Sequence, residues 1–257
     1  MTSQMRLPAE VLAAAESALG TRRFGSEFAW MSWAGTVWRL GGDSGAVFVK
    51  RAADLAGERD RLAWLAGRLP VPEVVGFVHA YGDDWLLTRE LSGIHLYNAS
   101  LGWDPERVAR RFGEILREIH ATDGSGCPFG EEAPGHVLIH GDYCLPNVLV
   151  EARRGAGPSF SPPGGEAAQG AGEDGGLAGL VDVGRAGLGD PRDDLAAGVW
   201  TLHYNYGHGF APAFVDAYGA PPMTAKEIEA LRRRYERPHK GKTVSTARQQ
   251  YHAATER

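Results

Sequence analysis

Cysteine is scarce in this sequence of 257 residues, in which Cys127 and Cys144 are the two present. Two thiols cannot supply the disulfide framework that stabilises many secreted domains, so we expect a reducing compartment, the cytoplasm. Long apolar runs are also missing: no stretch approaches the ~20 apolar residues of a membrane-spanning helix. The apolar run at residues 11–15 is too short for a signal peptide. These absences predict a soluble cytoplasmic protein without a membrane partner.

A strong excess of charge of either sign is absent as well. The net charge of −5 gives no reason to expect a nucleic-acid partner. The hydrophobic fraction of 43% and the charged fraction of 23% are those of an ordinary globular protein. The length suits one large domain or two lobes, and we expect a monomer or a weak dimer.

The stretch from residue 137 to residue 150, VLIHGDYCLPNVLV, places a polar turn between two short apolar runs. The runs at 137–139 and 148–150 are typical of buried strands that hold the intervening polar residues rigidly. Four residues separate Asp142 from Asn147, which is the spacing of the protein-kinase catalytic loop. Taken alone, the motif is equally compatible with a turn in which both side chains bond only their own backbone.

A lysine and a glutamate farther upstream form a second candidate pair. Strand-like runs at 37–40 and 46–50 surround a glycine-rich turn and predict a β-hairpin that ends at Lys50. The helix expected next, over about 54–68, carries a stripe of leucines with Glu58 in its middle. A carboxylate within an apolar stripe is costly unless it is paired, so Lys50 is the expected partner. The alternative is a Glu58 that reaches solvent from the edge of the stripe.

Two further segments complete the candidate nucleotide site. The glycine cluster at 41–45 has no helix after it to bind phosphate, so we favour the loop at 31–36, where small residues and the Ser32 hydroxyl can approach a ligand. A strand near residue 180 delivers Asp182 into a D-x-G turn of the kind that binds magnesium in kinases. A D-x-G sequence alone is weak evidence, because it is usually only a turn.

The remaining pattern predicts where the chain divides. Strands are expected at 71–79 and 84–91, around a turn at Gly82 and Asp83, and a helix at 104–120 follows a hinge at residues 92–93. We therefore expect a nucleotide-binding lobe at 1–91 and a catalytic and acceptor lobe at 92–257. His120, at the end of the helix, is interpreted as a capping or packing residue.

Two segments of the second lobe are expected to lack stable structure. Residues 151–178 contain eight glycines and three prolines with few large apolar side chains, which predicts a mobile loop. Residues 238–257 are polar and without periodicity, which predicts a frayed tail.

Lys50, Glu58, Asp142, Asn147 and Asp182 follow one another in the order of the kinase motifs. Five segments also resemble the aminoglycoside phosphotransferases, above all the 3'-O-phosphotransferase type: residues 85–90, 127–129, 140–147, 181–185 and 194–196. The resemblance covers about residues 28–236. It implies an α+β, two-lobed protein-kinase-like fold, with an antiparallel sheet and a helix in the N-terminal lobe and a mostly helical C-terminal lobe.

The same resemblance implies that the protein uses Mg-ATP, or Mg-GTP, to phosphorylate a hydroxyl group of an aminoglycoside antibiotic. The resemblance also implies a role for each candidate residue. Asp142 is the catalytic aspartate, and Asn147 and Asp182 ligate Mg²⁺. Ser32 and Lys50 bind the phosphates, Glu58 orients Lys50, and Phe48 packs on the adenine.

The acceptor half departs from the family pattern. Only ten residues separate Phe129 from His140, and residues 226–257 hold nine Lys or Arg against four Glu, although the expected antibiotic is a polycation. The candidate carboxylates for its ammonium groups are Glu131, Glu132, Asp190 and Asp193, which would form an acidic rim if residues 130–139 fold over the Asp142 pocket. Two alternatives therefore stay open: a kinase of another small hydroxylated molecule, such as a macrolide, a sugar or an amino alcohol, and a non-catalytic nucleotide-binding relative.

Overall fold

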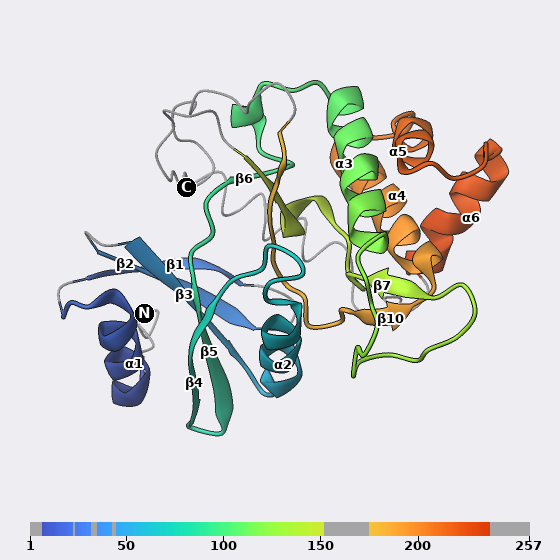
Figure 1. Ribbon diagram of the computed structural model, residues 1–257. Coiled ribbons are helices and arrows are strands. Elements are labelled where there is room, and N and C mark those ends of the chain that lie inside the picture. The colour runs from blue at the N-terminus through green and yellow to red at the C-terminus, as the bar shows by residue number, and fades with distance from the viewer. Residues whose placement is uncertain (1–6, 23, 32–34, 43–44, 152–174, 237–257) are drawn as a thin grey trace. The chain divides into compact units, whose positions relative to one another are not determined.

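A computed structural model describes the chain over residues 7–22, 24–31, 35–42, 45–151 and 175–236 (Figure 1). The chain divides into two compact units, one of Met1–Leu91 with Val181–Arg185 and the other of Ser92–Leu180 with Ala186–Arg257. Ser32, residues 152–174 of the glycine-rich segment and the tail at 238–257 lie outside the described residues, so the predictions made for them stay predictions. Within the described ranges, no helix has the length and apolarity that crossing a membrane requires.

The first unit contains a five-stranded antiparallel sheet in the order β1-β2-β3-β5-β4. Its strands are β1 Gly25–Met31, β2 Thr36–Gly42, β3 Gly45–Ala52, β4 Val74–Ala80 and β5 Asp83–Arg89. The predicted β2–β3 hairpin is confirmed. The turn between β4 and β5 lies at Tyr81 and Gly82, whose φ angles are 55° and 81°, one residue earlier than expected. Positive φ at both positions is the geometry of a tight two-residue hairpin turn.

The two faces of β3 separate the core from the candidate site. Successive side chains on a strand point to opposite faces. Val47 and Val49 are fully buried in a core cluster with Val11 and Ala15 of α1 (Ala9–Leu19). Phe48 and Lys50 lie at the alternate positions of β3, and the register sets Lys50 opposite Leu86 of β5. The α1 core therefore fixes the strand that carries Lys50.

The helix α2 is shorter than the sequence predicts. It spans Ala56–Leu65 and buries Leu62 and Leu65. Gly67 adopts a left-handed φ of 79°, which ends the helical path before the expected residue 68. Glu58 lies in the first turn of α2, where a carboxylate also interacts favourably with the helix dipole.

The second unit is mostly helical with short strands. Its elements are β6 Ile94–His95, η1 Ala99–Leu101, α3 Pro105–His120, β7 Val137–Ile139, η2 Leu145–Asn147, β8 Val148–Val150, β9 Leu177–Leu180, β10 Gly187–Gly189, α4 Pro191–Tyr206, α5 Ala211–Tyr218 and α6 Ala225–Glu236. Its core stacks the ring of Phe112 on Tyr143, with centroids 4.2 Å apart, and packs Phe112 against Phe214 at 5.2 Å. The α+β fold class is confirmed.

The two strands beside the catalytic-loop motif do not pair with each other. β7 pairs with β10, whereas β8 lies between β6 and β9 in a separate sheet. The two apolar runs are strands, as expected, but they belong to different sheets. Each end of the polar turn is instead anchored by a different sheet.

The C-terminal boundary predicted for the mobile loop at 151–178 is too late in the sequence. Leu177 already belongs to β9 and pairs with Val150. Just before it, the backbone oxygen of Gly175 accepts a hydrogen bond of 3.0 Å from Nε of Arg111. A Cβ at Gly175 would lie 2.4 Å from the ring of Trp103, so only glycine fits there. Backbone pairing, which composition does not reveal, orders this end of the segment.

Candidate active site

A three-membered charge cluster in the first unit surrounds Lys50. Its Nζ atom lies 2.7 Å from Oε2 of Glu58 and 2.6 Å from Oδ1 of Asp182. The exposed fractions of the side chains are 12% for Lys50 and Glu58 and 36% for Asp182. Burial alone would lower the pKa of Lys50, but the two carboxylates outweigh it and raise the pKa above its ordinary value. The ion pair expected between Lys50 and Glu58 is present, and Asp182 joins it.

The backbone around Asp182 is adapted to this cluster. Asp182 has a left-handed φ of 57°, which is uncommon for a residue other than glycine. The segment Val181–Arg185 belongs to the first unit although the strand before it, β9, belongs to the second. A Cβ at Gly184 would lie 3.4 Å from Oε2 of Glu58, an ordinary contact distance, so the D-x-G turn lies directly against the glutamate. The turn therefore brings the Asp182 carboxylate to Lys50 beside Glu58.

Asp142 and Asn147 are brought together within the second unit. Nδ2 of Asn147 donates a hydrogen bond of 2.9 Å to the backbone oxygen of Asp142. Because a carbonyl can only accept, this contact assigns the orientation of the amide and directs its Oδ1 atom elsewhere, where it can act as an oxygen ligand. Asn147 is 7% exposed and ends η2. Part of the turn interpretation is thus correct: Asn147 does bond the loop backbone.

A buried aspartate holds the backbone of the catalytic loop. Asp194 of α4 is fully buried, and its two oxygens accept hydrogen bonds of 2.7 Å from the backbone N–H of His140 and 2.8 Å from that of Gly141. Gly141 has a φ of 80°, a conformation that favours glycine. Nε2 of His120 lies 3.2 Å from Oδ2 of Asp194, and Nδ1 of His120 lies 3.0 Å from the Tyr218 hydroxyl. His120 is a packing residue, as expected, and it packs on the residue that supports the loop.

Asp142 itself already has partners. Its Oδ1 atom accepts a hydrogen bond of 2.6 Å from the hydroxyl of Tyr235 on α6, and the Cys144 thiol lies 3.6 Å away. Burial, and then the charge of Asp142, raise the pKa of the Cys144 thiol well above its ordinary value, so the thiol stays protonated. Neither Tyr235 nor Asp194 is predicted from the sequence to be part of this site. For Asp194 the segment at residues 194–196 was a signal, because it was among those that resemble the phosphotransferases.

The expected acidic rim is only partly assembled. Nε of Arg234 lies 2.7 Å from Asp193 and its Nη2 lies 3.0 Å from Asp190, so one guanidinium joins both carboxylates. Hydrogen bonds from Arg192, reinforced by the charge of Arg234, lower the pKa of Asp190 to about 2. Glu131 and Glu132 are exposed residues of the segment before β7. Asp190 and Asp193 therefore form an acidic pair whose charge is already balanced by arginine.

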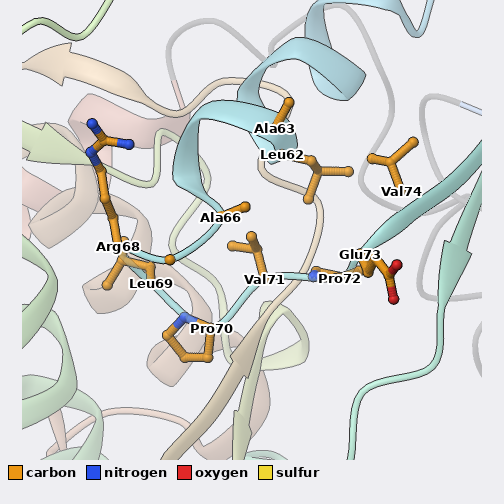
Figure 2. A pocket seen from close by; sticks show the side chains of 11 residues that line it. Leu62, Ala63, Ala66, Arg68, Leu69, Pro70, Val71, Pro72, Glu73 and Val74 are labelled. Carbon is orange, nitrogen blue, oxygen red and sulfur yellow. The ribbon is translucent and has the colours of Figure 1, made fainter.

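A depression at the end of α2 contains none of the candidate residues. Figure 2 shows its lining, which comes from residues 62–74 and is mostly aliphatic, with Arg68 and Glu73 as the charged members. Aliphatic side chains offer no nucleophile, base or metal ligand. The chemistry therefore lies with the Lys50 cluster and the Asp142 loop.

The sequence is similar to those of known proteins. Residues 28–136 match the model of a family described as the phosphotransferase enzyme family. The chain is 34% identical over 201 residues to a probable aminoglycoside 3'-phosphotransferase of Lactococcus lactis, a match that covers 61% of this chain and 68% of that protein. It is 24% identical over 215 residues to an aminoglycoside 3'-phosphotransferase of Niallia circulans, a match that covers 66% of this chain and 74% of that protein.

Solved structures show the same fold. The crystal structure of an aminoglycoside-3'-phosphotransferase of type VIII has a TM-score of 0.59 and 25% identity, and the match covers 86% of this chain and 97% of that one. The structure of a macrolide 2'-phosphotransferase from Brachybacterium faecium has a TM-score of 0.54 and 17% identity, and the match covers 95% of this chain and 96% of that one. The second likeness shows the fold alone. Together they confirm the expected kinase-like fold.

Proposed function

This chain belongs to the aminoglycoside phosphotransferase family, and we propose that it transfers the γ-phosphoryl group of ATP or GTP to a hydroxyl group of an aminoglycoside. It is a phosphotransferase with an alcohol group as acceptor. The observation that carries the proposal is the Lys50 cluster, because kinases bind nucleotide phosphates with a strand lysine that is paired with a helix glutamate.

The nucleotide roles follow from the chemistry of each group. Lys50 binds the α- and β-phosphates as a point charge, and Glu58 holds its ammonium group in place. Phe48 lies two residues before Lys50, on the same face of β3, and packs on the adenine. Ser32, outside the described residues, supplies a hydroxyl to the phosphates.

Two residues have the oxygen atoms that a hard cation prefers. Asp182 accepts from Lys50 through Oδ1, which leaves Oδ2 as a carboxylate ligand, and Asn147 offers its amide oxygen. Each of these oxygens is of the kind that Mg²⁺ prefers, and Mg²⁺ would neutralise charge on the β- and γ-phosphates. We propose Asn147 and Asp182 as its ligands.

Asp142 is the catalytic residue in this proposal. It accepts the proton of the attacking hydroxyl as the new oxygen–phosphorus bond forms, while the bond from the γ-phosphorus to the bridging oxygen breaks and the nucleoside diphosphate leaves. Asp194 keeps the loop in position by binding the two backbone N–H groups that precede Asp142. Phosphoryl transfer needs little more from a protein than positioning and charge stabilisation.

Calorimetry with Mg-ATP and Mg-GTP tests the nucleotide half. The folded protein should bind at least one of them in a magnesium-dependent manner. Lys50→Met should weaken binding about tenfold or more, because it removes a charge-assisted contact. Lys226→Met, at an exposed position of α6, makes the same change of charge elsewhere and should have no effect. A folded protein that binds neither nucleotide would refute the proposal.

One observation favours the second candidate, a kinase of a neutral hydroxylated molecule. Arg234 already balances Asp190 and Asp193, so the surroundings of Asp142 are less acidic than a polycationic acceptor requires. Turnover should be measured with kanamycin, a polycationic aminoglycoside, and with an uncharged sugar such as glucose, over a range of salt concentration. Activity on kanamycin that falls with salt supports the first candidate, because screening weakens multivalent attraction over ~10 Å at 0.1 M. Efficient, salt-independent activity on the sugar supports the second.

A further inference from the structure

Two consecutive residues of α6 contact Asp142 and the Asp190–Asp193 pair. Tyr235 donates its hydroxyl hydrogen bond to Oδ1 of Asp142 at 2.6 Å. Arg234, the residue before it, places its guanidinium on Asp190 and Asp193 at 3.0 and 2.7 Å. In Figure 1, α6 lies beside α4, the helix that begins at these two aspartates.

The chemistry of these contacts resembles that of an acceptor. The proposed reaction needs an alcohol-type O–H group hydrogen-bonded to Asp142, and the Tyr235 hydroxyl is such a group. Burial first, and then Cys144 and Asp142, raise the pKa of Tyr235 above its ordinary value, so its hydroxyl stays a donor. An aminoglycoside also carries cations that require carboxylates, and the Arg234 guanidinium occupies two of them.

The contacts differ in how readily they can be exchanged. The side chain of Arg234 is 41% exposed, and ion pairs that solvent reaches contribute little to stability. Tyr235 is held more firmly, since its ring packs on Trp200 with centroids 5.2 Å apart. Trp200 in turn stacks on the exposed Tyr204 at 5.2 Å. A ligand can therefore replace Arg234 at small cost, whereas replacing the Tyr235 hydroxyl moves an aromatic side chain.

We infer that Arg234 and Tyr235 occupy the positions of the acceptor's cation and hydroxyl, and that they are specificity-determining residues of this enzyme. An acceptor binds productively when it takes Asp142 from the Tyr235 hydroxyl, and a cationic acceptor also takes Asp190 and Asp193 from Arg234. Acceptors that cannot displace the Tyr235 hydroxyl from Asp142 are selected against. This inference rests on the proposed function, because it assigns Asp142 to the acceptor hydroxyl.

The first test removes the Tyr235 hydroxyl and keeps its ring. Tyr235→Phe frees Oδ1 of Asp142 for water or acceptor, so nucleotide hydrolysis without acceptor should rise, and KM for kanamycin should fall, each by about threefold to tenfold. Tyr204→Phe, on the exposed side of Trp200, is the matched control and should leave both values unchanged. A lower kcat with an unchanged KM would overturn the inference, because Tyr235 would then position Asp142. Unchanged values would overturn it too.

The second test removes the cation and remains informative if Tyr235→Phe does not fold. Arg234→Gln should lower KM for kanamycin by about threefold and make it more sensitive to salt, since Asp193 loses this partner and Asp190 keeps Arg192. Arg233→Gln removes the same charge one residue away, from a side chain paired with Glu229, and is the control. Equal KM values for the two variants would overturn the role of Arg234.

Nucleotide binding by the unaltered protein separates the two possible failures. If the protein binds no nucleotide, the proposed function fails. If it binds and hydrolyses the nucleotide normally but all four variants behave alike, the proposed function stands and the placement of α6 in the acceptor position fails.

Discussion

The charged groups of the two units are satisfied in different ways. In the first unit, Lys50, Glu58 and Asp182 satisfy one another, so this cluster is complete before a ligand arrives. In the second unit, side chains of α6 contact Asp142, Asp190 and Asp193, and Arg192 of α4 also binds Asp190. A cluster of the first kind is pre-organised for a ligand of constant chemistry, the nucleotide. In an arrangement of the second kind, the acceptor must replace side chains that already bind the carboxylates, which suits a site that selects its acceptor.

The largest expected effect separates the two units directly. Asp142→Asn should lower turnover by about 10²–10⁴-fold, because the amide cannot accept the proton of the acceptor. Nucleotide affinity should be nearly unchanged, since the first unit keeps its cluster. Asp182→Asn should impair both turnover and nucleotide affinity. Steady-state kinetics and calorimetry on the two variants check this, and near-normal turnover by Asp142→Asn would show that its assigned role is wrong.

The next prediction tests the support of the catalytic loop. Asp194→Asn keeps the shape of the side chain but turns an NH₂ group toward backbone N–H groups that need an acceptor. Breaking such a buried charged contact should reduce the free energy of unfolding by about 3 kcal/mol. Urea unfolding measures it, with Asp216→Asn, an exposed position of α5, as the control. A loss no greater than that of the control would mean that the loop holds its conformation without Asp194.

A smaller effect tests the pre-organisation of the first unit. Glu58→Gln keeps a hydrogen-bond acceptor for Lys50 but removes a charge, so Lys50 should interact more strongly with Asp182 than with residue 58. Nucleotide Kd should rise about threefold to tenfold, with little change in acceptor KM. Glu73→Gln, at an exposed ion pair of the same unit, is the control. If acceptor KM changed instead of nucleotide Kd, the assignment of nucleotide binding to the first unit and acceptor binding to the second would be wrong.

The same difference explains what the sequence could predict. Lys50 and Glu58 are eight residues apart, and a strand end followed by an apolar helix stripe is enough to pair them. The spacing from Asp142 to Asn147 likewise lies within one loop. The contact of Tyr235 with Asp142 joins residues separated by 93 positions, and Asp194 lies 54 positions from His140. No local pattern encodes such contacts, because they depend on how α4 and α6 pack.

The acidic rim shows most clearly what could not be predicted from the sequence. Their place in the sequence predicts that Asp190 and Asp193 are carboxylates near the catalytic loop, whereas the basic composition of residues 226–257 opposes a polycationic acceptor. Counting charges could not show that one of those arginines, Arg234, lies on both carboxylates. Net charge describes a segment, whereas affinity depends on which charges are already paired.

The smallest effect concerns Asp190 and its dependence on pH. The pKa of Asp190 in the folded state, about 2, lies below the usual value of about 3.9 for an unfolded chain. A lowered carboxyl pKa stabilises the folded state above the unfolded pKa, and this contribution is lost as the pH falls from about 4 through about 2. Its size should not exceed about 1 kcal/mol, because Arg192, the main cause of the shift, is 66% exposed and screened by solvent. Unfolding of the unaltered protein and of Asp190→Asn should therefore show a constant difference from pH 7 to pH 5 that shrinks below pH 4. A difference that grew on acidification would mean that Asp190 is protonated more easily in the folded protein, and that Arg192 and Arg234 do not hold its charge.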